Sequence, residues 1–101
     1  MKIIIKEPNK QPYIKEIEDD LKVEQNIVGG CIEVVPMTFS MVGKILMVCN
    51  EDGKHQGLPH NFFYGTDNVV GTVFFVGDNN DHTEFIGLIE EEIKEVMSWF
   101  E

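Results

Sequence analysis

The segment that organises the rest of this chain reads Val48-Cys49-Asn50-Glu51-Asp52-Gly53-Lys54-His55-Gln56-Gly57-Leu58-Pro59-His60-Asn61. The apolar run before it stops at Asn50, and the Asn, Asp and Gly residues favour a turn because they bond their own backbone or tolerate positive φ. Pro59 fixes its own φ and disfavours helix at Leu58, so the polar and aromatic segment from Asn61 begins at a defined corner. The sequence therefore predicts a strand that ends in an irregular loop, without a catalytic signature.

Length and composition fit one folded domain. The chain has 101 residues, so we expect a single domain over residues 1–101 with one modest core. A hydrophobic content of 43% separates it from disordered chains. No apolar run reaches the roughly 20 residues that cross a bilayer, and residues 1–7 meet charge too early for a signal peptide. We therefore expect a cytoplasmic protein without a membrane partner.

The charge balance is strongly acidic. The chain has 18 Asp and Glu residues against 8 lysines and no arginine, a net charge of −10. Clustered lysine and arginine supply most of the affinity for phosphate backbones, so direct binding of nucleic acid is disfavoured. Between residues 78 and 101, eight acidic residues stand against one lysine, a net charge of −7. The expected partner is a protein, either of the host or another copy of this chain as a homodimer.

The periodicity along the chain predicts an α+β fold: an antiparallel-rich sheet of about five strands with one short helix and one C-terminal amphipathic helix. Strands are expected at residues 2–7, 13–17, 31–36, 44–50 and 69–77, the last of them central because it is apolar on both faces. Gly71 inside that strand indicates a bulge or a close approach by another backbone. A short helix is expected at 21–28, ended by Gly29-Gly30. Residues 37–43 fit either a short edge strand or an ordered loop, and residues 61–64 fit a helical turn.

The last segment, residues 85–101, follows a polar turn at 78–82 and is predicted to be a helix that packs on the sheet by one stripe. The stripe consists of Ile86, Ile89, Ile93, Val96 or Met97, and Phe100. Trp99 lies off this stripe, which leaves it for a second packing surface or a contact between two copies of the chain.

Four groups of residues occur in a fixed order: Lys2-Ile3-Ile4-Ile5-Lys6-Glu7-Pro8; Val28-Gly29-Gly30 with Ile32-Glu33-Val34-Val35; Val48-Cys49-Asn50-Glu51-Asp52-Gly53-Lys54 with Gly57-Leu58-Pro59 and Asn61; and Val70-Gly71-Thr72 with Val76-Gly77-Asp78. Together they resemble domain-of-unknown-function family 3846, a group of small bacterial, plasmid and phage proteins. Members more often have a hydroxyl or acidic residue near the start of the last helix, where this chain has Gly87-Leu88-Ile89. The resemblance implies a mobile-element or gut-bacterial setting and brings no activity, cofactor or catalytic residue.

The loop is the first candidate site, because folds commonly place binding sites where a strand ends in an irregular segment. The candidate ligand-binding residues are Asn50, Glu51, Asp52, Lys54, Pro59, His60 and Asn61. The competing interpretation is a turn whose polar residues only satisfy its own backbone.

The last helix is the second candidate surface. Its acidic face consists of Glu90, Glu91, Glu92 and Glu95. Carboxylates on such a face could imitate a nucleic acid and occupy a basic groove on a host defence protein. The competing interpretation is a solvated face that keeps a small protein soluble.

Metal and catalytic chemistry are the less favoured interpretations. His55, His60 and His82 with Cys49 match no standard zinc spacing, so neither a metal nor another cofactor is expected. No Ser-His-Asp, Cys-His or glycine-rich phosphate motif is visible. The question of an enzyme stays open, with a non-catalytic function favoured.

The functional hypothesis is therefore a non-catalytic binding or protein-interaction module of a mobile-element family. One alternative is a protein that binds a nucleotide-like ligand, or an enzyme, using the loop at 50–61; the other is the acidic mimic. Phe62, Phe63, Tyr64 and Trp99 are expected in the core or a dimer contact. If they instead formed an exposed cluster beside the loop, they would favour a partner or nucleotide site.

Overall fold

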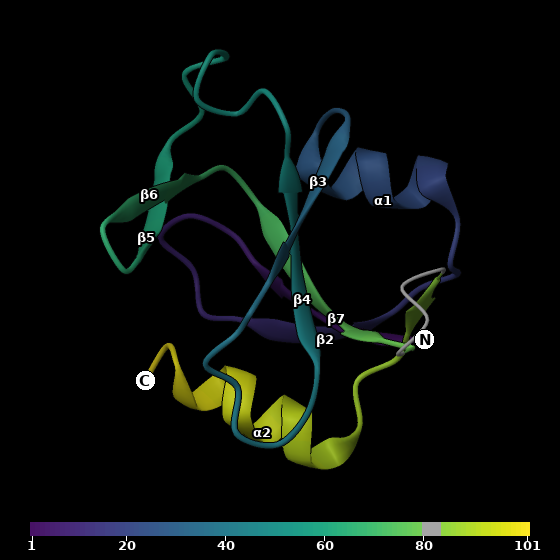
Figure 1. Cartoon of the computed structure of the whole chain (residues 1–101). Helices are drawn as coiled ribbons and strands as arrows, with labels where there is room; N and C mark the ends of the chain where they lie inside the picture. Colours follow the sequence, from purple (N-terminus) through teal and green to yellow (C-terminus); the bar gives the residue numbers. More distant parts are fainter. Residues whose placement is uncertain (80–83) are drawn as a thin grey trace.

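The computed structural model describes residues 1–79 and 84–101, which fold into an antiparallel sheet with a helix on each face (Figure 1). The elements are β1 (Lys2–Lys6), β2 (Tyr13–Glu16), α1 (Leu21–Val28), β3 (Ile32–Pro36), β4 (Ile45–Asn50), β5 (His60–Tyr64), β6 (Asp67–Val70), β7 (Val73–Asp78), β8 (Phe85–Ile86) and α2 (Glu90–Ser98). The main sheet has the strand order β2-β1-β7-β4-β3, with β8 also paired to β7, and β5 and β6 form a separate hairpin. The expected α+β class is confirmed.

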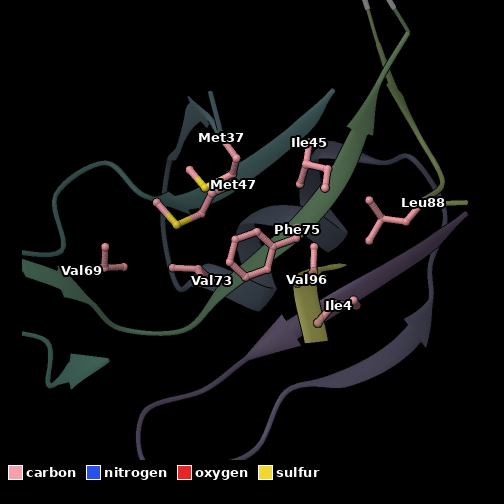
Figure 2. Packing of buried hydrophobic residues seen from close by; sticks show 9 residues of the cluster. All are labelled: Ile4, Met37, Ile45, Met47, Val69, Val73, Phe75, Leu88 and Val96. Atoms are coloured by element: carbon pink, nitrogen blue, oxygen red, sulfur yellow. The ribbon is translucent and has the colours of Figure 1, made fainter. Parts of the chain in front are cut away.

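The central strands β1, β7 and β4 are apolar at successive positions because both faces of the sheet are covered. The face under α2 buries Ile4, Met37, Ile45, Met47, Val69, Val73, Phe75, Leu88 and Val96 (Figure 2). The face under α1 buries Ile3, Ile5, Ile17, Val28, Leu46, Val48, Phe74 and Val76. Neighbouring residues such as Phe74 and Phe75 thus belong to opposite cores, as the alternation of side chains along a strand requires.

Helix α1 forms where the sequence predicts it. Asp20 precedes it, and one carboxylate oxygen accepts a hydrogen bond from the backbone N–H of Lys22 at 2.8 Å. Gly29 follows it in the left-handed region, at φ 82°, and its N–H donates to the Gln25 carbonyl. Neither α1 nor α2, the helices of the described residues, is long and apolar enough to cross a membrane.

The expected helical turn at 61–64 is wrong, because these residues form strand β5. Tyr64 pairs with Asp67, and Phe63 pairs with Asn68, across a two-residue turn in which Gly65 has φ 61°. Phe62 and Tyr64 are half-buried whereas Phe63 between them is exposed. Aromatic residues with this period of two favour a strand.

The single strand expected at 69–77 is divided at Gly71 into β6 and β7. Gly71 has φ 74°, and its N–H donates to the Pro59 carbonyl at 2.8 Å. A Cβ on Gly71 would lie 2.7 Å from the Leu58 side chain, so only glycine fits this approach of two segments. The chain leaves the hairpin here and enters the main sheet as β7, which is central as expected.

The C-terminal helix begins at Glu90, later than the expected residue 85. Phe85 and Ile86 pair with β7 as β8, so Ile86 and Ile89 are exposed and do not belong to the buried stripe. The Ile89 N–H donates to the Glu92 carboxylate at 2.9 Å, so a glutamate of the first turn caps the helix in place of a residue at its N-terminus. Residues 37–43 form a loop, and residues 80–82 of the polar turn expected at 78–82 lie outside the described residues.

Helix α1 holds a buried carboxyl group. The Glu24 side chain belongs to a residue only 3% exposed, and its Oε2 has no hydrogen-bond partner among the described residues. Burial, followed by a hydrogen bond to Asp19 and the charges of Asp19 and Asp20, raises the pKa of Glu24 to about 7. The folded protein therefore keeps a proton on Glu24 at pH values where the unfolded chain has lost it.

We predict that Glu24→Gln stabilises the protein above pH 7 and changes its stability little below pH 4.5. These limits are the pKa of Glu24 in the folded protein, about 7, and its ordinary value of 4.5 in the unfolded chain. Because the pKa is higher in the folded state, the free energy of unfolding of the unsubstituted protein falls as pH rises between these values. The amide keeps the shape of the side chain, can donate to Asp19 and removes a penalty on the order of 1–3 kcal/mol. Urea denaturation at both ends of this pH range measures the difference in free energy of unfolding between the variant and the unsubstituted protein. The same difference at both ends would contradict the prediction.

Candidate functional site

Asn50, the first residue of the candidate ligand site, is bound to its own surroundings. Its Nδ2 donates to the Val28 carbonyl and to Gln56 Oε1, both at 3.2 Å, and its Oδ1 accepts from the Asp52 N–H at 2.8 Å. Gly30 packs against this amide, since a Cβ there would lie 2.9 Å from Nδ2. Asn50 therefore joins the C-terminus of α1 to the start of the loop.

Asn61 plays a similar part at the end of the loop. Its Nδ2 donates to the carbonyls of Lys6 and Gly71, both at 2.8 Å, and its Oδ1 accepts from Lys6 Nζ at 2.9 Å. Lys6 is buried, and Nζ also donates to the Glu7 carbonyl and lies 5.6 Å from the centre of the Phe100 ring. Burial lowers the pKa of Lys6, against the opposing effect of Glu7. Asn61 thus ties β5 to the end of β1 and to the segment that enters β7.

The remaining candidates of the loop lie at the surface. Lys54 forms an ion pair with Asp67 at 2.6 Å, and its hydrogen bond to that carboxylate raises the pKa of Lys54. His60 bonds through Nδ1 to the side chain of Asn68. Glu51, Asp52 and Pro59 are also exposed. The loop residues named from the sequence therefore do not converge on one cavity.

A groove of about 300 Å³ lies beside the loop, between β3, β4 and β6, and we call it the loop groove. Its polar lining consists of Glu33, Cys49, Asn50, Glu51, Lys54, His55, Asp67 and Asn68, so it includes Asn50, Glu51 and Lys54 but not His60 or Asn61. Burial and then the nearby carboxylates raise the pKa of Cys49 to about 11, so its thiol is protonated and weakly nucleophilic at neutral pH. Within residues 1–79 and 84–101, no cluster of His, Cys, Asp and Glu could hold a metal ion.

A second cavity, of about 530 Å³, lies between β5, the loop from β3 to β4 and the end of α2. We call it the aromatic pocket, because apart from Met37 and Gly65 its lining consists of Phe39, Phe62, Phe63, Tyr64, Phe75, Trp99 and Phe100. Phe75 forms its fully buried floor, whereas Phe63 on its rim is 66% exposed. The cavity therefore joins the hydrophobic core directly to the surface.

Ring contacts hold the walls of the aromatic pocket together. The Phe39 ring centre lies 4.8 Å from that of Trp99 and 5.5 Å from that of Tyr64. Phe75 meets Trp99 edge to face at 5.6 Å. No hydrogen bond within the described part of the chain involves the Tyr64 hydroxyl or the Trp99 Nε1.

The four glutamates of the acidic face have three different environments. Glu90 and Glu91 are exposed, whereas Glu92 is buried and caps α2. Glu95 accepts hydrogen bonds of 3.1–3.2 Å from Ser40 Oγ and from the N–H groups of Met41 and Val42. Glu95 thus fastens the loop that carries Phe39, a wall residue of the aromatic pocket, to α2.

The sequence alone does not reveal the aromatic pocket, because its residues come from three distant segments of the chain, 37–39, 62–75 and 99–100. The available signal is the clustering of adjacent aromatic residues at 62–64 and 99–100 within polar surroundings. Phe62, Tyr64 and Trp99 pack against the core as expected, and together with the exposed Phe63 they also line a cavity that opens to the surface.

Comparison with known families matches residues 1–101 to the family described as Domain of unknown function (DUF3846). No curated protein and no solved structure matches the chain significantly. The family description carries no activity, so the function has to be argued from the geometry of this chain.

We predict that Asn61→Ala lowers the free energy of unfolding by about 2–4 kcal/mol, because it removes a donor to two backbone carbonyls and one of the two carbonyl acceptors of the buried Lys6 ammonium. Asn68→Ala is the matched control, since the side chain of the exposed Asn68 bonds only the exposed His60 side chain among the described residues. Urea denaturation measures both variants. If the two substitutions cost the same, Asn61 does not hold the strands together.

We predict that Glu95→Ala lowers the free energy of unfolding by about 1–3 kcal/mol and shifts the fluorescence of Trp99 to longer wavelength. The substitution removes the acceptor that holds residues 40–42, so Phe39 is released from the Trp99 ring and water reaches the indole. Trp99 is the single tryptophan of the chain, so emission reports directly on the aromatic pocket. Glu91→Ala, on the exposed side of α2, should leave the emission unchanged, and an unchanged emission in Glu95→Ala would show that Glu95 does not order this wall.

Proposed function

The chain belongs to the DUF3846 family, and we propose that it is a non-catalytic protein-interaction module that holds its partner in the aromatic pocket. The observation that carries the proposal is an aromatic cavity with a buried floor and an exposed rim. Interface centres are enriched in aromatic side chains and methionine, and buried aromatic anchors supply much of the binding energy of protein complexes.

Exposed apolar side chains also occur on the loop that borders the pocket. Met41 is 89% exposed, Val42 is exposed as well, and both lie on the loop that carries Phe39. This loop and the exposed Phe63 border the same cavity through Phe39 and Phe63. Exposed apolar side chains on segments that border a pocket are typical of contact with a macromolecule, which supports a protein partner over a small ligand.

Charge indicates the chemistry of the partner. The net charge is −10, arginine is absent, and Glu90 and Glu91 are exposed at the start of α2. A second copy of the chain would bring the same negative charge, so repulsion opposes a homodimer. A basic protein that inserts apolar side chains is favoured, because complementary fields accelerate encounter and apolar contacts then slow dissociation.

Two other functions have weaker support. A planar, nucleotide-like ligand could stack on the rings of the pocket, whose volume of about 530 Å³ suits small ligands. The loop residues first expected to bind such a ligand contribute little, since Asn50 and Asn61 already bond the backbone. An acidic mimic of nucleic acid would have to rely on Glu90 and Glu91, since Glu92 and Glu95 are engaged within the protein.

The cellular setting is part of the proposal. The resemblance to plasmid and phage proteins supports a mobile-element role in the cytoplasm. The partner would then be a basic protein of the host cell.

We predict that peptides selected on the intact protein from a random displayed library are basic and contain an aromatic or leucine anchor. Titration of a selected peptide should change the Trp99 emission, and Phe63→Ser should weaken its binding by about 10–100-fold. Phe63 is exposed, so this variant should keep its stability, and Tyr13→Ser on β2 is a matched exposed control.

Nucleotides titrated under the same conditions provide the second arm of this experiment. Selection of acidic peptides, or of peptides insensitive to Phe63→Ser, would overturn the proposal. A saturable response of Trp99 to a nucleotide, without any selected peptide, would establish the ligand function in its place.

A further inference from the structure

Strand β3 is one edge of the main sheet, and the phase of its pairing shows which backbone groups face outward. Cys31 accepts a hydrogen bond from the Glu51 N–H, and the Met37 N–H donates to the Ile45 carbonyl, both at 2.8 Å. Backbone groups alternate between the two sides of an antiparallel strand, so the odd-numbered residues 31–37 bond β4. The N–H and carbonyl groups of Ile32 and Val34 therefore face the free edge, whereas Pro36 offers a carbonyl alone.

Cavities lie along both faces of this edge. Val34 and Pro36 line a cavity of about 360 Å³ together with Leu46 and Phe85, residues of the core under α1 or packed against it. Glu33 and Val35 line the loop groove on the opposite face. Each residue from 33 to 36 thus borders a cavity. Because side chains alternate along a strand, neighbouring residues border cavities on opposite faces of the sheet. Strand β2, at the opposite end of the strand order, contributes no residue to either cavity.

The charged groups beside this edge are mostly acidic. Asp19 and Glu84 border the cavity on the α1 side, and Glu33 and Glu51 border the loop groove. Lys54, the lysine of the loop groove, is paired with Asp67. Cationic side chains of a partner would therefore meet opposite charge on either face of the strand.

We propose that the partner adds an extended segment to the free edge of β3, with lysine or arginine side chains alternating with apolar ones. Backbone hydrogen bonds to Ile32 and Val34 supply affinity, and the cavities on the two faces select alternate side chains, as in other cases of strand addition. Met37, directly after β3, lines the aromatic pocket, so a segment on this edge runs toward that pocket. The inference rests on the proposed function for the class of partner and adds the mode of binding.

Amide hydrogen exchange on the unmodified protein tests this mode. The probe is a short synthetic peptide in which lysine alternates with phenylalanine and valine, and the control peptide has glutamate in place of lysine. Binding of the probe should slow exchange of the Ile32 and Val34 amides by at least about tenfold and leave the edge amides of β2 unchanged. The glutamate peptide should not bind.

Two changes of the backbone provide independent tests. Two versions of the probe are N-methylated, one at its odd-numbered and one at its even-numbered residues. One of the two should bind at least about tenfold more weakly, since its N–H groups can no longer donate to the outward carbonyls of β3. Val34→Pro removes an outward N–H and should weaken binding to a similar degree, whereas Val34→Thr keeps the N–H and should not. Because Val34→Pro could also disturb folding, the N-methylated peptides and the exchange experiment decide the outcome if that variant is unstable.

The outcomes separate this inference from the proposed function. If the probe binds and changes the Trp99 emission but leaves the Ile32 and Val34 amides unprotected, strand addition is overturned while the aromatic pocket keeps its role. If Phe63→Ser has no effect but the edge amides are protected, the aromatic pocket loses its role and strand addition stands. Failure of the probe to bind at millimolar concentration overturns strand addition by a basic and apolar segment.

Discussion

The burial of β7 on both faces is the constraint on which the rest of the structure depends. Phe74 and Phe75 point to opposite sides of the sheet, and both are fully buried. Each face therefore needs its own cover, which a chain of 101 residues supplies with α1 on one side and with α2 and the β5–β6 hairpin on the other. Because α2 is short, aromatic side chains of the hairpin complete the second cover. The floor of the aromatic pocket is then Phe75 itself, so the candidate site is an opening in the core rather than an addition to the surface.

Asparagine side chains fasten this cover to the sheet. Asn50 and Asn61 bond backbone groups of segments far from them in sequence, and Asn61 also satisfies the buried ammonium of Lys6. An amide can donate and accept in the same place, so it satisfies mixed backbone groups without adding a charge that burial would penalise. The polar residues of the loop are therefore explained largely by folding.

The local parts of the fold could be predicted from the sequence, and the parts set by distant contacts could not. Strands β1 to β4 and helix α1 follow from β-branched runs, short turns and Gly29, all of which act within a few residues. The division at Gly71 depends on Leu58 and Pro59, and the late start of α2 depends on the pairing of β8 with β7. The same limit applies to the site. Asn50 and Asn61 look like ligand-binding residues until their backbone partners are known, and the aromatic pocket exists only after three segments meet.

The acidic face of α2 and the aromatic pocket are linked through Glu95. Glu92 caps α2 and Glu95 holds the loop of Phe39, so one carboxylate of the acidic face orders a wall of the aromatic pocket. Glu90 and Glu91 stay in solvent, where they add to the long-range field of the chain. Charges in solvent are screened within about 10 Å at ordinary salt and contribute mainly to the rate of encounter, whereas desolvated aromatic contacts contribute mainly to lifetime. In the proposed function, an acidic exterior around an aromatic cavity would therefore select partners twice, first by the sign of their charge and then by the apolar side chain that they can insert.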